Sequence, residues 1–174
     1  LNSNSNDITV NRNWSNSGTF PAGTGTVNFA SNTTATIIGD TTFYNFSCVI
    51  PAGGKTIQFA ATSTQAIAAG GSFTVTGASG VANLVQLVST VGGSQWSIDP
   101  SATSTVAYAI VRDSNNSSGV NNITATNSRD DGNNDVVTPG GWIFTPTTLT
   151  WIGAVDTDWE TWGNWDKGYP PNTT

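Results

Sequence analysis

The chain has 174 residues and a formal net charge of −6, and only 9% of its residues are charged. This length suits one domain with a real core, whereas the acidic balance excludes the basic stripe that nucleic-acid binding needs. No apolar run approaches the roughly 18 residues that span a bilayer, so we expect no membrane insertion.

Short apolar runs separated by Gly, Asn, Ser and Thr follow one another along the chain, with almost no helical periodicity. Most runs alternate apolar and polar residues, as at Val27/Phe29, Ile57/Phe59 and Phe73/Val75. This period of two is the pleat of a half-buried strand, so the sequence predicts an all-β fold. In chain order the clearer runs lie at 8–10, 26–29, 35–38, 43–50, 56–60, 65–68, 72–77, 83–89, 95–99, 105–111, 122–126 and 141–145.

Two all-β architectures fit these runs. Taken in threes, with first strands at Val27, Ile57, Val85 and Ile123, the runs repeat at steps of about 30 residues, which favours a parallel β-helix of about four coils. A β-sandwich stays the alternative, although few dipeptides such as Ser79-Gly80 suit its tight hairpins.

Two residue types limit the chemistry. The single cysteine, Cys48, lies in the apolar run 43–50 and is expected to be a buried, inert thiol. The chain has no histidine, which excludes Ser-His-Asp catalysis and His-ligated metals.

The stretch "SRDDGNND", Ser128 to Asp135, is a candidate metal site, because oxygen ligands surround a glycine there. Calcium takes six to eight such ligands, and the candidates are Asp130, Asp131 and Asp135. The spacing does not match an EF-hand. The alternative is a turn in which Asn and Asp side chains cap their own backbone, and we expect no other cofactor.

Tryptophans gather near the end of the chain at Trp151, Trp159, Trp162 and Trp165. The acids Asp156, Asp158, Glu160 and Asp166 lie among them. We expect these indoles to cover the open end of a solenoid or to pack against a neighbouring module. Sugar binding by indole stacking is the alternative. Catalysis is disfavoured, because it needs two carboxyls roughly 5–10 Å apart and no acid falls in the middle of a predicted strand. We therefore expect no enzyme, and a polysaccharide-degrading β-helix enzyme is the least favoured reading.

A family resemblance supports the β-helix. The stretch "NWSNSGTFPAGTGTVNFASNTTATIIGDTTFYNFSC" resembles a repeat of very large surface and secreted proteins of bacteria. The stretch "GSQWSIDPSATSTVAYAIVRDSNNSSGVNNITATNSRDDGNNDVVTPGGWIF" is similar to the next part of that family, although "DVVTPG" is an insertion. Together the two cover most of residues 11–145. They imply a right-handed parallel β-helix in an extracellular adhesin-like or fibre-like protein, without assigned catalytic residues.

The tryptophan pattern W-x-G-x-x-D-x-x-W-x-x-x-x-N-W also resembles a segment at the start of β-helix units in those proteins. We therefore divide the chain into a β-helix domain, 1–145, and a capping or inter-module segment, 146–174. A chain that begins at Leu1 and contains no methionine is expected to be processed, trimmed or part of a longer protein.

The sequence thus predicts a non-enzymatic structural module at the cell surface or outside the cell. Its expected partners are copies of itself or neighbouring modules, with polysaccharide as a further candidate. The expected contact residues are Ile8, Val10 and Trp14 at the N-terminal edge, and Trp151, Trp159, Trp162 and Trp165 at the other end.

Overall fold

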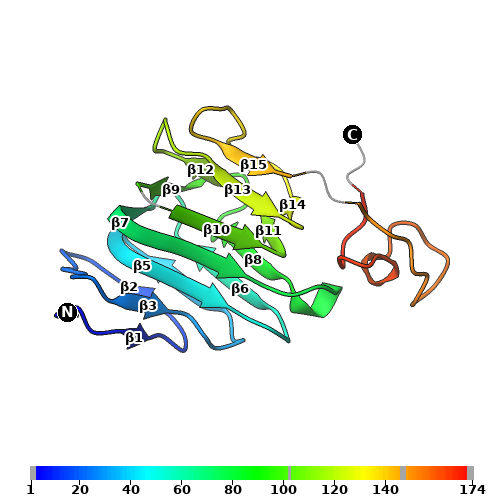
Figure 1. Ribbon diagram of the computed structural model, residues 1–174, viewed down its shortest axis with the longest axis horizontal. Helices are drawn as coiled ribbons and strands as arrows, with labels where there is room; N and C mark the ends of the chain where they lie inside the picture. Colours follow the sequence, from blue (N-terminus) through cyan, green and yellow to red (C-terminus); the bar gives the residue numbers. More distant parts are fainter. Residues whose placement is uncertain (1–2, 102, 146–147, 172–174) are drawn as a thin grey trace.

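The computed structural model describes residues 3–101, 103–145 and 148–171, which are nearly all β with strands paired in parallel (Figure 1). This confirms the predicted all-β class. The strands form a larger sheet, sheet A, and a smaller one, sheet B. Sheet A runs in the order β1 (Ile8–Thr9), β3 (Thr26–Asn28), β5 (Thr41–Val49), β7 (Thr64–Thr76), β10 (Thr103–Ala107), β13 (Ile123–Thr126), β15 (Trp142–Phe144). A side branch leaves it at β7, where β9 (Trp96–Pro100) pairs with β7 and β12 (Ser114–Asn116) pairs with β9. Sheet B runs β14 (Arg129–Asp130), β11 (Ala109–Val111), β8 (Val85–Ser89), β6 (Lys55–Phe59), β4 (Ala35–Ile38), β2 (Trp14–Ser15).

From β1 to β8 the chain alternates between the two sheets, and each strand from β1 to β6 pairs with the strand two places further on. The step along sheet A is 19 residues from Ile8 to Val27 and 19 from Val27 to Phe46. It lengthens to 27 residues from Phe46 to Phe73. Part of this lengthening lies within β7, where the register with β5 shifts between the pairs Phe43–Ile67 and Asn45–Ser72. The first half of β7 pairs with both β5 and the side branch.

The predicted grouping in threes is wrong in its membership. Val27 pairs within sheet A, whereas Ile57, its assumed equivalent, pairs with Ala35 and Leu87 in sheet B. Alternation of apolar and polar residues marks any half-buried strand, and the strands of the two sheets share it. Spacing alone could therefore not identify which strands are neighbours.

The β-sandwich alternative predicted hairpins, whose strands are antiparallel neighbours. Every pairing between the named strands of the described residues is parallel. Parallel neighbours require the chain to return to the same end before each new strand. The segments that make this return are the strands of the other sheet and the loops between them.

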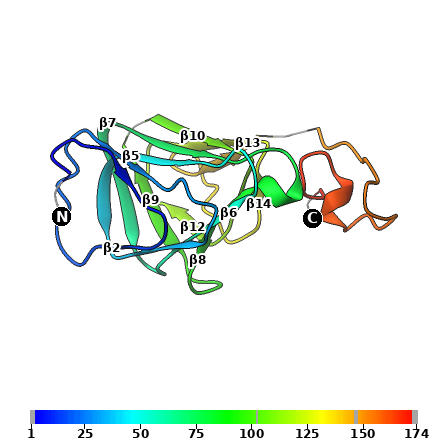
Figure 2. The ribbon, with the colours of Figure 1, turned by 90° about the horizontal axis from the view of Figure 1, so that it is seen from below.

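Figure 2 shows the two sheets as layers, and the inward side chains of both meet in one core. Aromatic rings meet in this core, and Phe46 and Phe73 occupy paired positions of β5 and β7. The Phe46 ring lies 5.0 Å from Phe29 and 5.2 Å from Phe73, and the Phe59 ring stacks on Trp96 at 3.8 Å. Aromatic side chains of this size provide much of the apolar area that stabilises the fold.

A bend divides β7 where it leaves the side branch for the main run of sheet A. Gly70 has a φ of +81°, a conformation that favours glycine. A Cβ on Gly71 would lie 1.9 Å from the backbone oxygen of Tyr44 on β5. The register between β5 and β7 shifts at this point, so the two glycines allow a close approach that other residues would prevent.

Candidate functional site

The C-terminal tryptophan segment, residues 148–171, contains one short 3₁₀-helix, η2 (Trp162–Asn164), and is otherwise irregular. It is built around the side chain of Asn164, which is fully buried. The Asn164 Oδ1 accepts hydrogen bonds from the backbone N–H groups of Val155 (2.8 Å) and Asp156 (3.2 Å). Its Nδ2 donates to the Asp156 carboxylate (2.7 Å) and the Asp158 carbonyl (3.0 Å). The side-chain amide of Asn164 therefore fixes the loop that contains residues 155–158.

Asp156 is the second organising residue of this segment. Its carboxylate accepts hydrogen bonds from the Asp158 backbone N–H (2.8 Å), from Asn164 and from the Thr161 hydroxyl (3.0 Å). These bonds, with that from Asp158 the largest contribution, lower the pKa of Asp156 below its ordinary value because they favour the charged form.

Three of the four predicted indoles contact one another. Trp151 and Trp159 stack at 5.6 Å with an interplanar angle of 10°, and Trp165 meets Trp159 edge-on at 4.4 Å. Trp165 is 3% exposed and donates from Nε1 to the Trp159 carbonyl (3.0 Å), whereas Trp151 and Trp159 are 37% and 55% exposed. The segment therefore buries one indole itself and leaves a rigid pair at its surface.

Trp162 contacts the sheets instead of the other indoles. Its ring lies 4.6 Å from the guanidinium carbon of Arg129 on β14, a cation–π contact. Tyr169 is 5% exposed and packs with Leu84 and Ile110. A Cβ on Gly168 would lie 2.2 Å from the backbone nitrogen of Val81, in the 3₁₀-helix η1 (Val81–Asn83). The segment is docked tightly on the molecule.

The position of this docking corrects the expectation that the segment covers the open end of the core. The described contacts run to residues 79–84, which lead from β7 of sheet A to β8 of sheet B, and to Ile110 on β11 and Arg129 on β14. Figure 1 shows the segment beside the strands, whereas the last strand, β15, lies at another edge. Tyr169 and Leu84 supply the apolar contact that attracts it there. The predicted boundary between residues 145 and 146 adjoins 146–147, outside the described residues.

The predicted N-terminal contact residues belong mainly to the core. Trp14 is 7% exposed and Val10 9%, while Ile8 on the edge strand β1 is half-buried. The Trp14 ring packs edge-on against Phe20 at 4.9 Å, and its Nε1 donates to the Thr41 hydroxyl (3.1 Å). Ile8 lies on β1, Val10 directly follows it and Trp14 lies on β2, and among the described contacts none joins them to the C-terminal indoles.

The predicted calcium ligands point to different partners. Asp131 pairs with Arg112 (3.5 Å) and Arg129 (3.3 Å), whereas Asp130 accepts hydrogen bonds from Gly132 and Asn134. The Asp135 carboxylate accepts from the backbone N–H of Val137 (3.0 Å). Within the part of the chain that the structure describes, no three His, Cys, Asp or Glu side chains gather as a metal site would require. Calcium binding stays a prediction.

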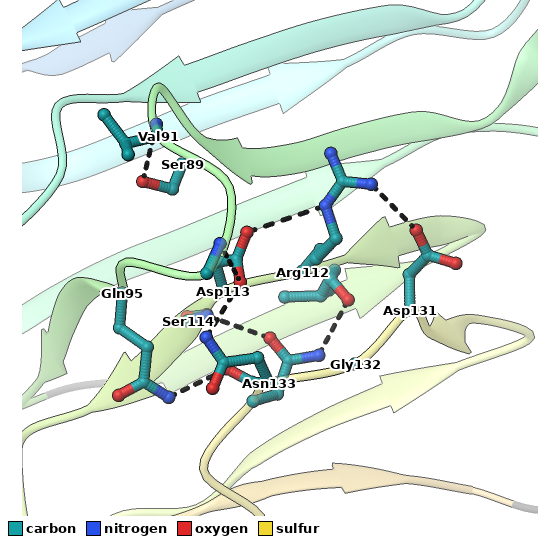
Figure 3. Close-up of polar contacts among 12 residues, drawn as sticks. Ser89, Val91, Gln95, Arg112, Asp113, Ser114, Asp131, Gly132 and Asn133 are labelled. Carbon is teal, nitrogen blue, oxygen red and sulfur yellow. Dashed lines mark hydrogen bonds and ion pairs between the residues drawn. The ribbon is translucent and has the colours of Figure 1, made fainter.

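Sequence reasoning missed a polar corner around Asp113, shown in Figure 3. Asp113 is 2% exposed. Its Oδ1 accepts hydrogen bonds from the Gly93 N–H (3.1 Å) and from the Asn133 Nδ2 (2.8 Å). Gly93 lies 20 residues before Asp113 in the sequence, and Asn133 lies 20 residues after it. Asp113 also has a φ of +56°. An Asp between Arg112 and a Ser-Asn pair is a turn signal, but nothing in the sequence gives its partners.

This corner brings two carboxylates to one guanidinium. Arg112 lies 3.6 Å from Asp113 and 3.5 Å from Asp131. Acid catalysis requires a carboxyl that a substrate can reach, and burial closes Asp113 to solvent. The arrangement is that of an ion pair that joins neighbouring turns.

Cys48 is fully buried, as predicted. Burial raises the pKa of its thiol to about 12, because desolvation disfavours the thiolate. Since the thiolate is the reactive form, Cys48 is inert at neutral pH.

Comparison with family models, with curated proteins and with solved structures finds no match to this chain. Among the helices that lie in residues 3–101, 103–145 and 148–171, none is long and apolar enough to cross a membrane.

Proposed function

We propose that this chain is a non-enzymatic structural module of an extracellular or cell-surface protein, and that it stacks end to end on copies of itself or on neighbouring modules. In this proposal the two sheets are sides of a right-handed parallel β-helix. The alternation of strands between sheets A and B and the recurring step of 19 residues support it. The family resemblance and the low content of charged residues support a place outside the cell.

The observation that carries the proposal is the position of the edge strands. β1 and β2 end sheets A and B on one side, and β15 and β14 end them on the other. A parallel sheet offers unlike edges at its two sides, so one copy's first strands can pair with another copy's last strands. Such a head-to-tail contact does not close on itself and generates a filament.

The surfaces beside these edges suit the same contact. A hollow of about 450 Å³ lies along residues 13–20, next to β2. Between the last strands of the two sheets, Val136 and Val137 are 51% and 72% exposed. Burial of the two exposed valines against another copy would favour association.

Negative-stain electron microscopy of the purified chain over a range of concentrations tests the proposal. Rods that lengthen with concentration are expected. Uniform particles at every concentration would contradict the fibre and leave only a module within a larger adhesin-like protein.

The proposal needs no resident metal. Calcium binding at Asp130, Asp131 and Asp135 would compete with the ion pairs of Asp131 to two arginines. We therefore expect the same midpoint of thermal unfolding in calcium and in a chelator. A midpoint that rises with calcium and falls again with the chelator would show that the loop is a calcium site.

A second candidate function rests on the exposed pair of Trp151 and Trp159. Parallel indoles held by Trp165 and Asn164 offer a pre-ordered face for a sugar ring. Titration of tryptophan fluorescence with soluble neutral polysaccharides tests it. Binding that is lost in Trp151→Ala/Trp159→Ala and kept in Trp162→Ala would support this function, and a flat titration of the unaltered chain would exclude it for those polymers.

A further inference from the structure

The outer face of sheet A presents polar side chains in regular columns. The strand register aligns Thr9 with Asn28, Asn28 with Ser47, Ser47 with Thr74, and Thr74 with Thr105. Since Val106 pairs with Ala125, the column continues to Thr124. One hydroxyl or amide therefore stands on each of six neighbouring strands.

Two shorter columns run beside the first, displaced by two residues along each strand. One contains Thr26, Asn45, Ser72 and Thr103, and the other contains Val49, Thr76, Ala107 and Thr126. We call the three columns together the hydroxyl face. All its members are exposed or half-buried, and none is charged or aromatic. Figure 1 looks onto this side of the sheet, where β3, β5, β7, β10 and β13 lie side by side.

The geometry of the hydroxyl face is set by the backbone. Neighbouring strands are about 4.8 Å apart, and alternate residues along one parallel strand are about 6.6 Å apart. Threonine has a stiff χ1 torsion, and within one column neighbouring strands are linked by the hydrogen bond from the Ser72 hydroxyl to the Asn45 Oδ1 (2.9 Å). The face therefore holds hydroxyls and methyls in a fixed two-dimensional array at little further cost in entropy.

The chemistry of the face excludes most macromolecular ligands. A charged polymer requires opposite charge, and the hydroxyl face has none. Protein partners are held mainly by Trp, Tyr and Arg anchors, and sugar rings by aromatic stacking. The outer face of sheet B is different, because Arg129 and Ile110 interrupt it and the tryptophan segment covers part of it.

We propose that the hydroxyl face binds crystalline ice. Ice is a neutral lattice whose surface oxygens repeat at distances close to those of the array in both directions. Threonine offers a hydroxyl for hydrogen bonding and a methyl that restricts nearby water, so water over the face is ordered in the repeat of the lattice before contact. Binding to ice uses the side of the molecule rather than its edges and does not depend on end-to-end assembly.

Slow growth of an ice hemisphere in a dilute solution of fluorescently labelled protein tests this. The unaltered chain is expected to enter the ice and to retard recrystallisation. Thr74→Lys/Thr105→Lys, which places two cations at the centre of the hydroxyl face, is expected to lose incorporation. The matched control is Thr56→Lys/Gln86→Lys, which alters neighbouring residues on the outer face of sheet B and should be incorporated like the unaltered chain.

Thermal unfolding of each variant confirms that it is folded, and Thr105→Ala is a milder substitution if the double lysine variant is not. Exclusion of the unaltered chain from ice would overturn the proposal. So would equal incorporation of the face variant and the control. Adsorption to crystalline cellulose or chitin without incorporation into ice would also overturn it and assign the face to a polysaccharide.

Discussion

At the scale of single residues, Asn164 determines the shape of the tryptophan segment. Asn164→Ala removes four side-chain hydrogen bonds in a buried setting. Leaving such groups unsatisfied costs about 1–3 kcal/mol. We expect a red-shifted tryptophan emission from a loosened segment, while the far-ultraviolet signal of the sheets is unchanged. The exposed Asn11 provides the control, and equal spectra of Asn164→Ala and Asn11→Ala would contradict the assigned role.

Asp156 makes the same segment sensitive to acid. Its pKa in the folded chain lies below the ordinary value, so its stabilising contribution is complete above about pH 4 and is lost as pH falls through the folded pKa. Tryptophan emission should therefore change in acid before the sheets unfold.

Asp156→Asn should reduce that acid transition. It should not remove it, because Asp166 also has a lowered pKa: hydrogen bonds from Lys167 and Thr150 outweigh the opposing effect of burial. An acid transition in Asp156→Asn as large as in the unaltered chain would show that this carboxylate does not hold the segment.

The residue scale also marks a limit of sequence reasoning. The pattern of tryptophans and acids predicted the cluster, and three indoles do meet. It did not single out Asn164 or Asp113, because a buried amide or carboxylate in a chain rich in Asn and Asp looks like any turn residue. The importance of Asp113 depends on partners 20 residues away on either side, and that of Asn164 on the irregular loop that folds around it.

At the scale of elements, the core is tested by Phe59, which joins β6 to β9 through its stack on Trp96. Phe59→Ala should destabilise the fold by about 3–5 kcal/mol, because it leaves a cavity between the rings. For a chain of this length that lowers the unfolding midpoint by on the order of 10 °C. Trp151→Ala, at an exposed indole, should leave the midpoint nearly unchanged. A comparable drop in both variants would contradict the assigned core.

Asp113 tests how neighbouring turns are held together. Asp113→Ala loses hydrogen bonds to Gly93 and Asn133 and places alanine at a positive φ. We expect a loss of about 2–4 kcal/mol in denaturant unfolding. Asp113→Asn should lose less, since asparagine tolerates that φ and keeps one acceptor. The opposite order of the two variants would refute the proposed link.

Sequence patterns were sufficient for the strands but not for their pairing. Val27, Phe29, Ile57, Phe59, Phe73 and Val75 are all buried as the alternation predicted. The neighbours of Ile57 were wrongly assigned, because register depends on how many residues each return of the chain contains, and loops of variable length separate the strands. The docking of the tryptophan segment was likewise hidden, since Tyr169 and Leu84 are far apart in sequence.

At the scale of the whole molecule, the unlike edges of the two sheets are the feature that predicts assembly. Val10 N–H donates to the Asn28 carbonyl and Asn16 N–H to the Ile38 carbonyl. Alternate residues of a strand face opposite sides, so the N–H groups of Thr9 and Ser15 point away from β3 and β4. They are the donors that a second copy would use.

Sedimentation velocity over a range of concentrations, with prolines at these two positions, tests end-to-end stacking most directly. Thr9→Pro/Ser15→Pro removes both donors, and Thr9→Ala/Ser15→Ala keeps them. The account predicts that the unaltered chain and the alanine variant grow in size with concentration, while the proline variant stays monomeric with the same unfolding midpoint. A monomeric unaltered chain at every concentration, or a proline variant that assembles as readily as the alanine variant, would contradict it.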